Sequence, residues 1–120
     1  MQEPYSLVRG STFDIGPIAA EMRGEAVYER EGHTARTLVR ETDLRVVLVV
    51  MKAGAIIKEH RANATASIHV LSGRVGVRLQ DRSTDLTGGR LLVLEKGLPH
   101  AVEATEESAF LLTLGWHEKT

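Results

Sequence analysis

Apolar residues occur along this chain in short, strand-sized runs that are separated by polar or glycine-containing turns. The clearest run, Leu44–Met51 (LRVVLVVM), is nearly continuous and rich in β-branched residues, which predicts a strand with both faces covered. The pattern predicts further strands at Ser67–Leu71, Arg74–Leu79, Arg90–Leu94, His100–Ala104 and Ser108–Leu114. Short strands at a spacing of about ten residues, without alternating helices, predict an all-β domain built as a sandwich or closed barrel.

One segment near the N-terminus has the pattern of a helix. Gly16–Pro17 places a proline close to the first helical position, and Ile18–Met22 follows before Gly24. We therefore expect a single short helix before residue 30, stabilised by packing against the rest of the domain. The 120 residues suit one domain, which we divide into an N-terminal arm with the helix (1–35), a barrel (36–115) and a tail (116–120).

Composition and charge exclude several classes of function. The chain has no cysteine, which excludes disulfides, thiolate metal sites and a cysteine nucleophile. Its net charge of −1 argues against a nucleic-acid partner, because such proteins usually carry a basic face that neutralises phosphates. No apolar run is long enough to span a bilayer, and Met1–Gly10 lacks the pattern of a signal peptide. We therefore expect no membrane partner and a cytoplasmic location.

Two stretches repeat glycine and histidine at a defined spacing. The first runs from Gly54 to a Val-Leu-Ser-Gly turn, and the second runs from Gly89 to Ala104. Together they resemble the two signature motifs of the cupin superfamily, through Gly54, His60, Gly73, Gly89, Gly97 and His100. The resemblance implies an antiparallel jelly-roll barrel that often pairs into a dimer. Glu95 and Ala104 depart from the family pattern, which has proline and asparagine at these positions.

The resemblance also implies a metal site, and this sequence departs from it most strongly there. Metal-binding cupins supply two histidines and a glutamate from the first motif and one histidine from the second. Here Ala62 and Ala66 stand where the second histidine and the glutamate belong, and only His60 and His100 remain. Zinc and iron sites of the catalytic kind use about three protein ligands, so two imidazoles alone should hold a divalent metal weakly.

Strand parity separates the remaining candidate side chains. If the strand is regular from Ala66 to Leu71, Ala66, Ile68 and Val70 share the inner face and His69 points away from it. By the same parity, Glu59 and Glu103 should point away from their neighbouring histidines, although a local distortion could turn one inward. We expect two other histidines to be solvated, one in a loop and one in the tail: His33 and His117.

The function we favour is that of a small-molecule-binding protein of the cupin fold. Its pocket would be small and apolar, with His60 and His100 at the polar end and Ala62 and Ala66 beside them. We expect an unidentified small molecule as ligand, no tightly bound cofactor, and at most a weakly held divalent metal at His60 and His100. The alternative is a metal-dependent cupin enzyme of the dioxygenase or isomerase type with a non-standard site. A structural or sensory module is a third class.

We also expect a homodimer. The predicted outer sheet presents His69 together with the apolar run Val46–Met51, whose second face needs a cover. A partner barrel could supply that cover through an interface of standard size.

Overall fold

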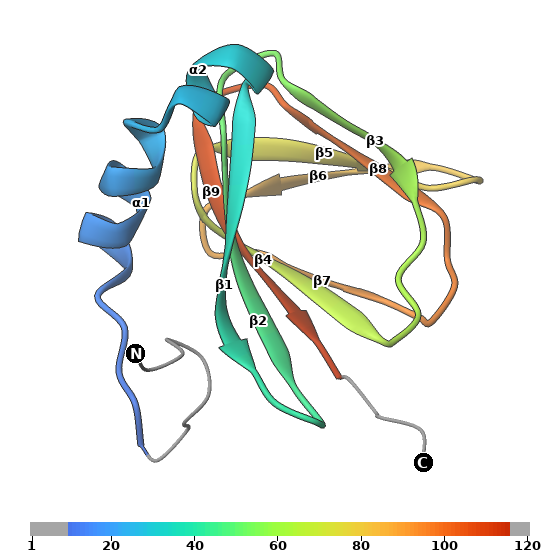
Figure 1. Cartoon of the computed structure of the whole chain (residues 1–120). Helices are drawn as coiled ribbons and strands as arrows, with labels where there is room; N and C mark the ends of the chain where they lie inside the picture. The colour runs from blue at the N-terminus through green and yellow to red at the C-terminus, as the bar shows by residue number, and fades with distance from the viewer. Residues whose placement is uncertain (1–9, 116–120) are drawn as a thin grey trace.

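The computed structural model of the chain describes residues 10–115, which form two short helices and nine strands (Figure 1). The helices are α1 (Ile15–Arg23) and α2 (Ala26–Glu31). The strands are β1 (His33–Arg40), β2 (Arg45–Met51), β3 (Ile56–His60), β4 (Ala66–Ser72), β5 (Arg74–Arg78), β6 (Ser83–Thr87), β7 (Leu91–Leu94), β8 (His100–Ala104) and β9 (Ser108–Leu114). Within this range, no helix is long and apolar enough to cross a membrane.

The strands form two antiparallel sheets that face each other. The five-stranded sheet has the order β1-β2-β9-β4-β7, and the four-stranded sheet has the order β3-β8-β5-β6. Figure 1 shows the two sheets inclined to each other, and each sheet has its own strand order, so they do not close into one continuous barrel. The predicted all-β, antiparallel jelly-roll is confirmed.

The main core fills the space between the sheets. β2, β4 and β5 contribute alternate residues to it, such as Val49, Ile68 and Val75, which are all buried. Alternation places one face of each strand inward, so every second residue packs against the opposite sheet. The parity that places Ile68 and Val70 on one inner face is therefore confirmed.

A second, smaller core lies on the outer face of the five-stranded sheet. Met22 of α1 and Tyr28 of α2 pack there with Leu48 and Val50 of β2. The helices are also tied to the strands by ion pairs, of which Arg36 with Glu21 and Glu25, at 2.5 and 2.6 Å, is the closest. β2 is thus covered on both faces, as its continuous apolar pattern predicts, but the outer cover is the chain's own helices.

Several elements differ from the sequence prediction. The prediction of a single helix is wrong, because α2 follows α1 after only Gly24 and Glu25. α2 has six residues, too few for a periodic pattern, and it ends at Gly32, whose φ of 84° few other residues adopt. β1 begins at His33, inside the expected arm and not in a loop, while β3 and β6 were not predicted as strands. The tail with His117 lies outside the described residues.

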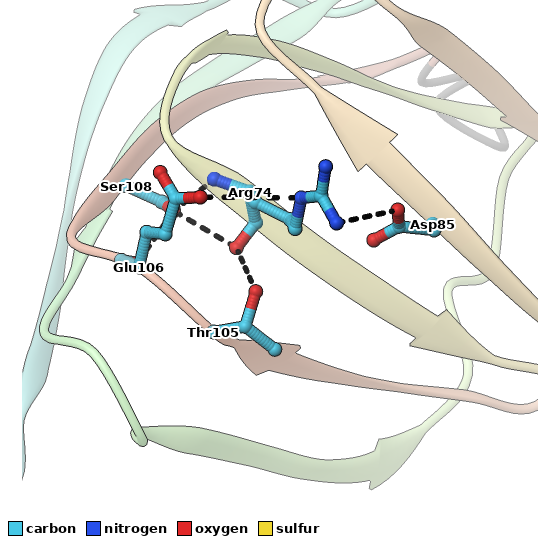
Figure 2. Close-up of polar contacts among 5 residues, drawn as sticks. All are labelled: Arg74, Asp85, Thr105, Glu106 and Ser108. Carbon is cyan, nitrogen blue, oxygen red and sulfur yellow. Dashed lines mark hydrogen bonds and ion pairs between the residues drawn. The ribbon is translucent and has the colours of Figure 1, made fainter.

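The turn between β4 and β5 explains one of the motif glycines. Gly73 has a φ of 85°, and a Cβ there would lie 2.2 Å from the carbonyl oxygen of Glu107. The buried Ser108 hydroxyl accepts a hydrogen bond from the Arg74 N–H at 2.9 Å and donates to the Glu106 carbonyl at 2.7 Å. Figure 2 shows these contacts, with the Arg74 guanidinium 3.3 Å from Asp85. The network joins the β4–β5 turn to the β8–β9 turn and leaves no room for a side chain at position 73.

Candidate functional site

A cavity of about 240 Å³ lies between the two sheets. Its wall is mostly aliphatic, with side chains from both sheets, and its polar lining residues are three histidines. The lining residues are His33, Ala35, Val47, Val49, Ile57, His60, Ile68, His100, Val102, Phe110 and Leu112. A concave, largely apolar space with a few convergent polar groups is the usual form of a small-molecule site.

His60 and His100 form the polar side of this cavity. They are cross-strand partners at the paired ends of β3 and β8, and their ring centroids are 4.3 Å apart with an interplanar angle of 59°. The register of β3 shifts between Ile57 and His60, so both residues line the cavity although they are three positions apart. The structure therefore brings together the two histidines that the paired motifs single out.

Backbone carbonyls hold both imidazole rings. The Nδ1 atom of His60 lies 3.0 Å from the carbonyl oxygen of Lys58, and that of His100 lies 2.9 Å from the carbonyl oxygen of Leu98. A carbonyl oxygen only accepts, so each Nδ1 must carry the proton and donate it. In the neutral state, each Nε2 is then left with a lone pair that can accept a hydrogen bond or bind a cation.

The two histidines differ in their exposure to solvent. His60 is exposed, whereas His100 is only 2% exposed. Burial lowers the pKa of His100 below its ordinary value of 6.5, and the neighbouring His60 lowers this pKa further. The Leu98 carbonyl and, more weakly, the Glu59 carboxylate raise the same pKa without reversing the shift. His100 is therefore neutral at pH 7.

His33 is the cavity residue that the sequence analysis missed. It lies at the start of β1, is half-buried, and lines the cavity with Ala35, its neighbour at i+2. The expectation that it is a solvated loop residue is wrong. Strand parity relative to Ala35 would have found it, but β1 was not predicted because its sequence, HTARTLVR, does not alternate between apolar and polar residues.

The two alanines of the predicted site do not line the cavity. Ala66 begins β4 and is buried beside Leu94 and Leu114, its partners on the neighbouring strands. Ala62 lies in the segment between β3 and β4, where its carbonyl accepts a hydrogen bond from the Gly97 N–H at 2.9 Å.

The other candidate ligands lie away from the cavity. Half-buried His69 is paired with Leu111 and Leu91 on the opposite face of the sheet from Ile68. Glu103 borders a shallow hollow on the outer face of the four-stranded sheet, and Glu59 is exposed at the end of β3. The parity argument for these three residues agrees with the positions in the structure.

The residues present do not fit a metal centre with three or four protein ligands. Among residues 10–115, no three histidine, aspartate or glutamate side chains are arranged to hold a metal ion. His60 and His100 could contribute to a weaker site, each through its Nε2 atom.

Comparison with known proteins identifies the family. A sequence model of the cupin domain matches residues 47–115, which is more than half of the chain and includes both histidines. The chain belongs to the cupin family. The match begins within β2 and ends after β9, so it covers most of both sheets and leaves out the two helices. No curated protein sequence matches the chain significantly.

Solved structures share the fold of this cupin at low sequence identity. A conserved protein of unknown function from Streptococcus pyogenes has a TM-score of 0.71 and 21% identity over 99% of this chain and 98% of that one. KdgF from Halomonas sp. has a TM-score of 0.64 and 23% identity over 72% and 82%. Salicylate 1,2-dioxygenase from Pseudoaminobacter salicylatoxidans, solved with gentisate, has a TM-score of 0.76 and 16% identity over 86% and 32%. At such identities the likeness concerns the fold.

Proposed function

We propose that this cupin is a small-molecule-binding protein whose ligand occupies the cavity beside His60 and His100. The observation that carries the proposal is the composition of the wall, in which aliphatic side chains from both sheets surround one histidine pair. Such a wall binds an apolar body by the hydrophobic effect, while the histidines orient one polar group.

The volume of the cavity limits the size of the ligand. An apolar cavity of about 150 Å³ is large enough to hold benzene in another protein. The 240 Å³ here therefore suits a single substituted ring or an aliphatic molecule of similar size. A sugar or nucleotide would leave many hydroxyl groups without partners against the aliphatic wall.

A metal-dependent cupin enzyme of the dioxygenase or isomerase type is the second candidate. It is favoured by the Nδ1 hydrogen bonds of His60 and His100, because metal-binding histidines are commonly oriented by such bonds from the other ring nitrogen. The dioxygenase and KdgF share the fold, which supports this candidate only at that level. We propose that any divalent ion is held weakly and that no cofactor is bound tightly.

We also propose that the protein forms a homodimer through the part of the five-stranded sheet that the helices leave open. Figure 1 shows α1 and α2 beside β1 and β2, far from the edge strand β7. On the outer face of β7, Leu91 and Val93 are 59% and 61% exposed, and half-buried His69 lies next to Leu91. Exposed aliphatic residues grouped on a sheet face suit a self-complementary interface.

The experiment that tests the binding proposal fills the cavity. Ile57→Phe adds volume at the cavity wall, whereas Ile56→Phe adds the same group on the outer face of β3, where Ile56 is exposed. Native mass spectrometry and calorimetry with toluene should show binding to the unmodified protein and to Ile56→Phe, and loss of binding in Ile57→Phe. Equal binding by the two variants, or failure of the unmodified protein to bind either toluene or phenol, would contradict the proposal.

A further inference from the structure

The hydrogen bonds of the histidine pair restrict the chemical group that the cavity can accept. The two Nδ1 protons are donated to the carbonyl oxygens of Lys58 and Leu98, at 3.0 and 2.9 Å. Because each Nδ1 proton is already donated to the backbone, a neutral imidazole held in this way has no second N–H to offer a ligand. The Nε2 atoms of His60 and His100 are the ring positions left for a ligand, and each is an acceptor when its imidazole is neutral.

The described residues in the rest of the cavity wall supply no permanently charged group that would attract an anionic ligand. Apart from the histidines, the lining side chains are alanine, valine, isoleucine, leucine and phenylalanine, and none of the described lining residues is a lysine or an arginine. A carboxylate that moved from water to this mostly aliphatic wall would lose hydration without gaining a lysine or arginine partner. It would also face the lone pairs of two imidazoles whose centroids are only 4.3 Å apart.

We infer that the cavity selects a compact apolar molecule carrying a neutral hydrogen-bond donor, a hydroxyl or an amine, and that it rejects carboxylates of the same size. This inference rests on the proposed binding function and specifies its ligand class. The donor group lies against the Nε2 atoms of His60 and His100, and the apolar body contacts the aliphatic wall. Two adjacent acceptors suit an amine, which has two N–H groups, at least as well as a hydroxyl.

A matched series of monosubstituted benzenes tests the inference. Toluene, phenol, aniline and benzoate have similar rings, and at pH 7.5 only benzoate is charged. Calorimetry should show phenol and aniline binding about three- to tenfold more tightly than toluene, which is the usual net effect of one neutral hydrogen bond. Benzoate should bind at least about tenfold more weakly than toluene, because its charge is desolvated without a partner.

Two variants assign the preference to the histidine pair. His60→Leu removes one acceptor at an exposed position, so the fold should persist, and the advantage of phenol over toluene should shrink while toluene still binds. His69→Leu is the matched control on the outer face of the other sheet and should retain the full preference. His100→Leu gives a second test of the acceptor pair.

The outcomes separate the inference from the binding proposal. If toluene binds but benzoate binds as tightly as phenol, the inferred preference for a neutral hydrogen-bond donor is overturned and the binding function stands. The preference for a donor is also overturned if His60→Leu and His100→Leu both leave the ratio of phenol to toluene affinity unchanged. If none of the four compounds binds, both proposals fail.

Discussion

His60 and His100 face each other across neighbouring strands, and each ring is held by a hydrogen bond to the carbonyl of the residue two positions earlier. The two histidines are thus cross-strand partners at adjacent ends of β3 and β8, and their rings make the same kind of hydrogen bond to the backbone. One partner is exposed and the other is almost fully buried. The pair therefore combines an accessible group, which can be replaced at little cost to the fold, with a buried group whose ionisation is coupled to folding.

Replacing His60 by alanine should affect ligand binding more than stability. Because its side chain is exposed, the free energy of unfolding should change by no more than about 0.5 kcal/mol. The affinity for phenol should fall about three- to tenfold, since one acceptor is lost from the cavity. Thermal unfolding and calorimetry of the same samples compare the two effects. His69→Ala is the control, and a large loss of stability without a change in affinity would make His60 a structural residue.

The stability of the protein should decrease in mild acid because of His100. Burial lowers its pKa in the folded state, while the unfolded chain has the ordinary value of 6.5. The unfolded state therefore binds the proton more readily, and protonation favours unfolding. The contribution is fully present above about pH 6.5 and is lost as the pH falls through the lowered folded-state pKa.

Urea unfolding between pH 5 and pH 8 measures this contribution against His100→Asn. An asparagine amide can still donate to the Leu98 carbonyl but does not titrate in this range. The unmodified protein should lose more stability than the variant on going from pH 7 to pH 5. Parallel pH profiles would show that His100 does not carry the effect.

Most of the two sheets could be predicted from the sequence because their strands are buried on one or both faces. β8 and β9 have the predicted bounds, β2, β5 and β7 differ from prediction by one residue at one end, and β4 extends one residue further at both ends. A buried strand face requires apolar residues at alternate positions, or at every position where both faces are buried, and this pattern can be recognised in the sequence. β3 has no buried residue, β6 has one and β1 has two adjacent ones, so neither alternation nor a continuous apolar run marks these strands in the sequence.

The candidate site could be predicted only in part. The histidine pair follows from spacing, since two motifs place His60 and His100 on adjacent strands. His33 comes from a strand far away in sequence, and only the folding of β1 over the cavity shows that it contributes. Ala62 and Ala66 are expected at the pocket because they occupy the positions of two metal ligands in the family motif, and neither residue lines the cavity.

Gly73→Ala should be among the most destabilising single substitutions in this domain. The left-handed φ of 85° strains any Cβ, and the new atom would also overlap the Glu107 carbonyl and Ser108. We expect a loss of roughly 2–4 kcal/mol. Gly89→Ala is the control, because its φ is 92° but nothing lies within 4 Å of the added Cβ, so it should cost only about 1–2 kcal/mol. Equal losses in urea unfolding would show that the crowding around Ser108 is relieved.

Charged residues on β7 should dissociate the proposed dimer. Leu91→Asp with Val93→Asp places two carboxylates on the outer face where both aliphatic side chains are now exposed. Sedimentation at micromolar concentration should show a dimer for the unmodified protein and a monomer for the variant, with unchanged circular dichroism. Ile56→Asp, on the outer face of the other sheet, should remain dimeric. A monomeric unmodified protein would refute the dimer.

Metal retention separates the binding protein from the enzyme. With two imidazoles as ligands, the purified protein should lose iron, manganese, nickel or zinc to a mild chelator, because stable sites of these metals use three or more protein ligands. Elemental analysis after dialysis measures this directly. Stoichiometric metal that survives the chelator would favour the enzyme and would require a third ligand, for which His33 is the cavity residue available.

Restoring the ligands at the two alanine positions should reverse this behaviour. Ala62→His with Ala66→Glu recreates the ligand types that the family motif places there, beside His60 and His100. Ala66 is buried, so an unpaired glutamate at this position should lower the thermal stability of the metal-free variant. Added zinc or manganese should raise its melting temperature, since a ligand that binds only the folded state stabilises it by mass action. The unmodified protein should respond little to the same metals, and Ala62→His alone should respond less than the double variant. A double variant that gains no stability from metal would mean that the backbone of this cupin no longer brings the four positions together.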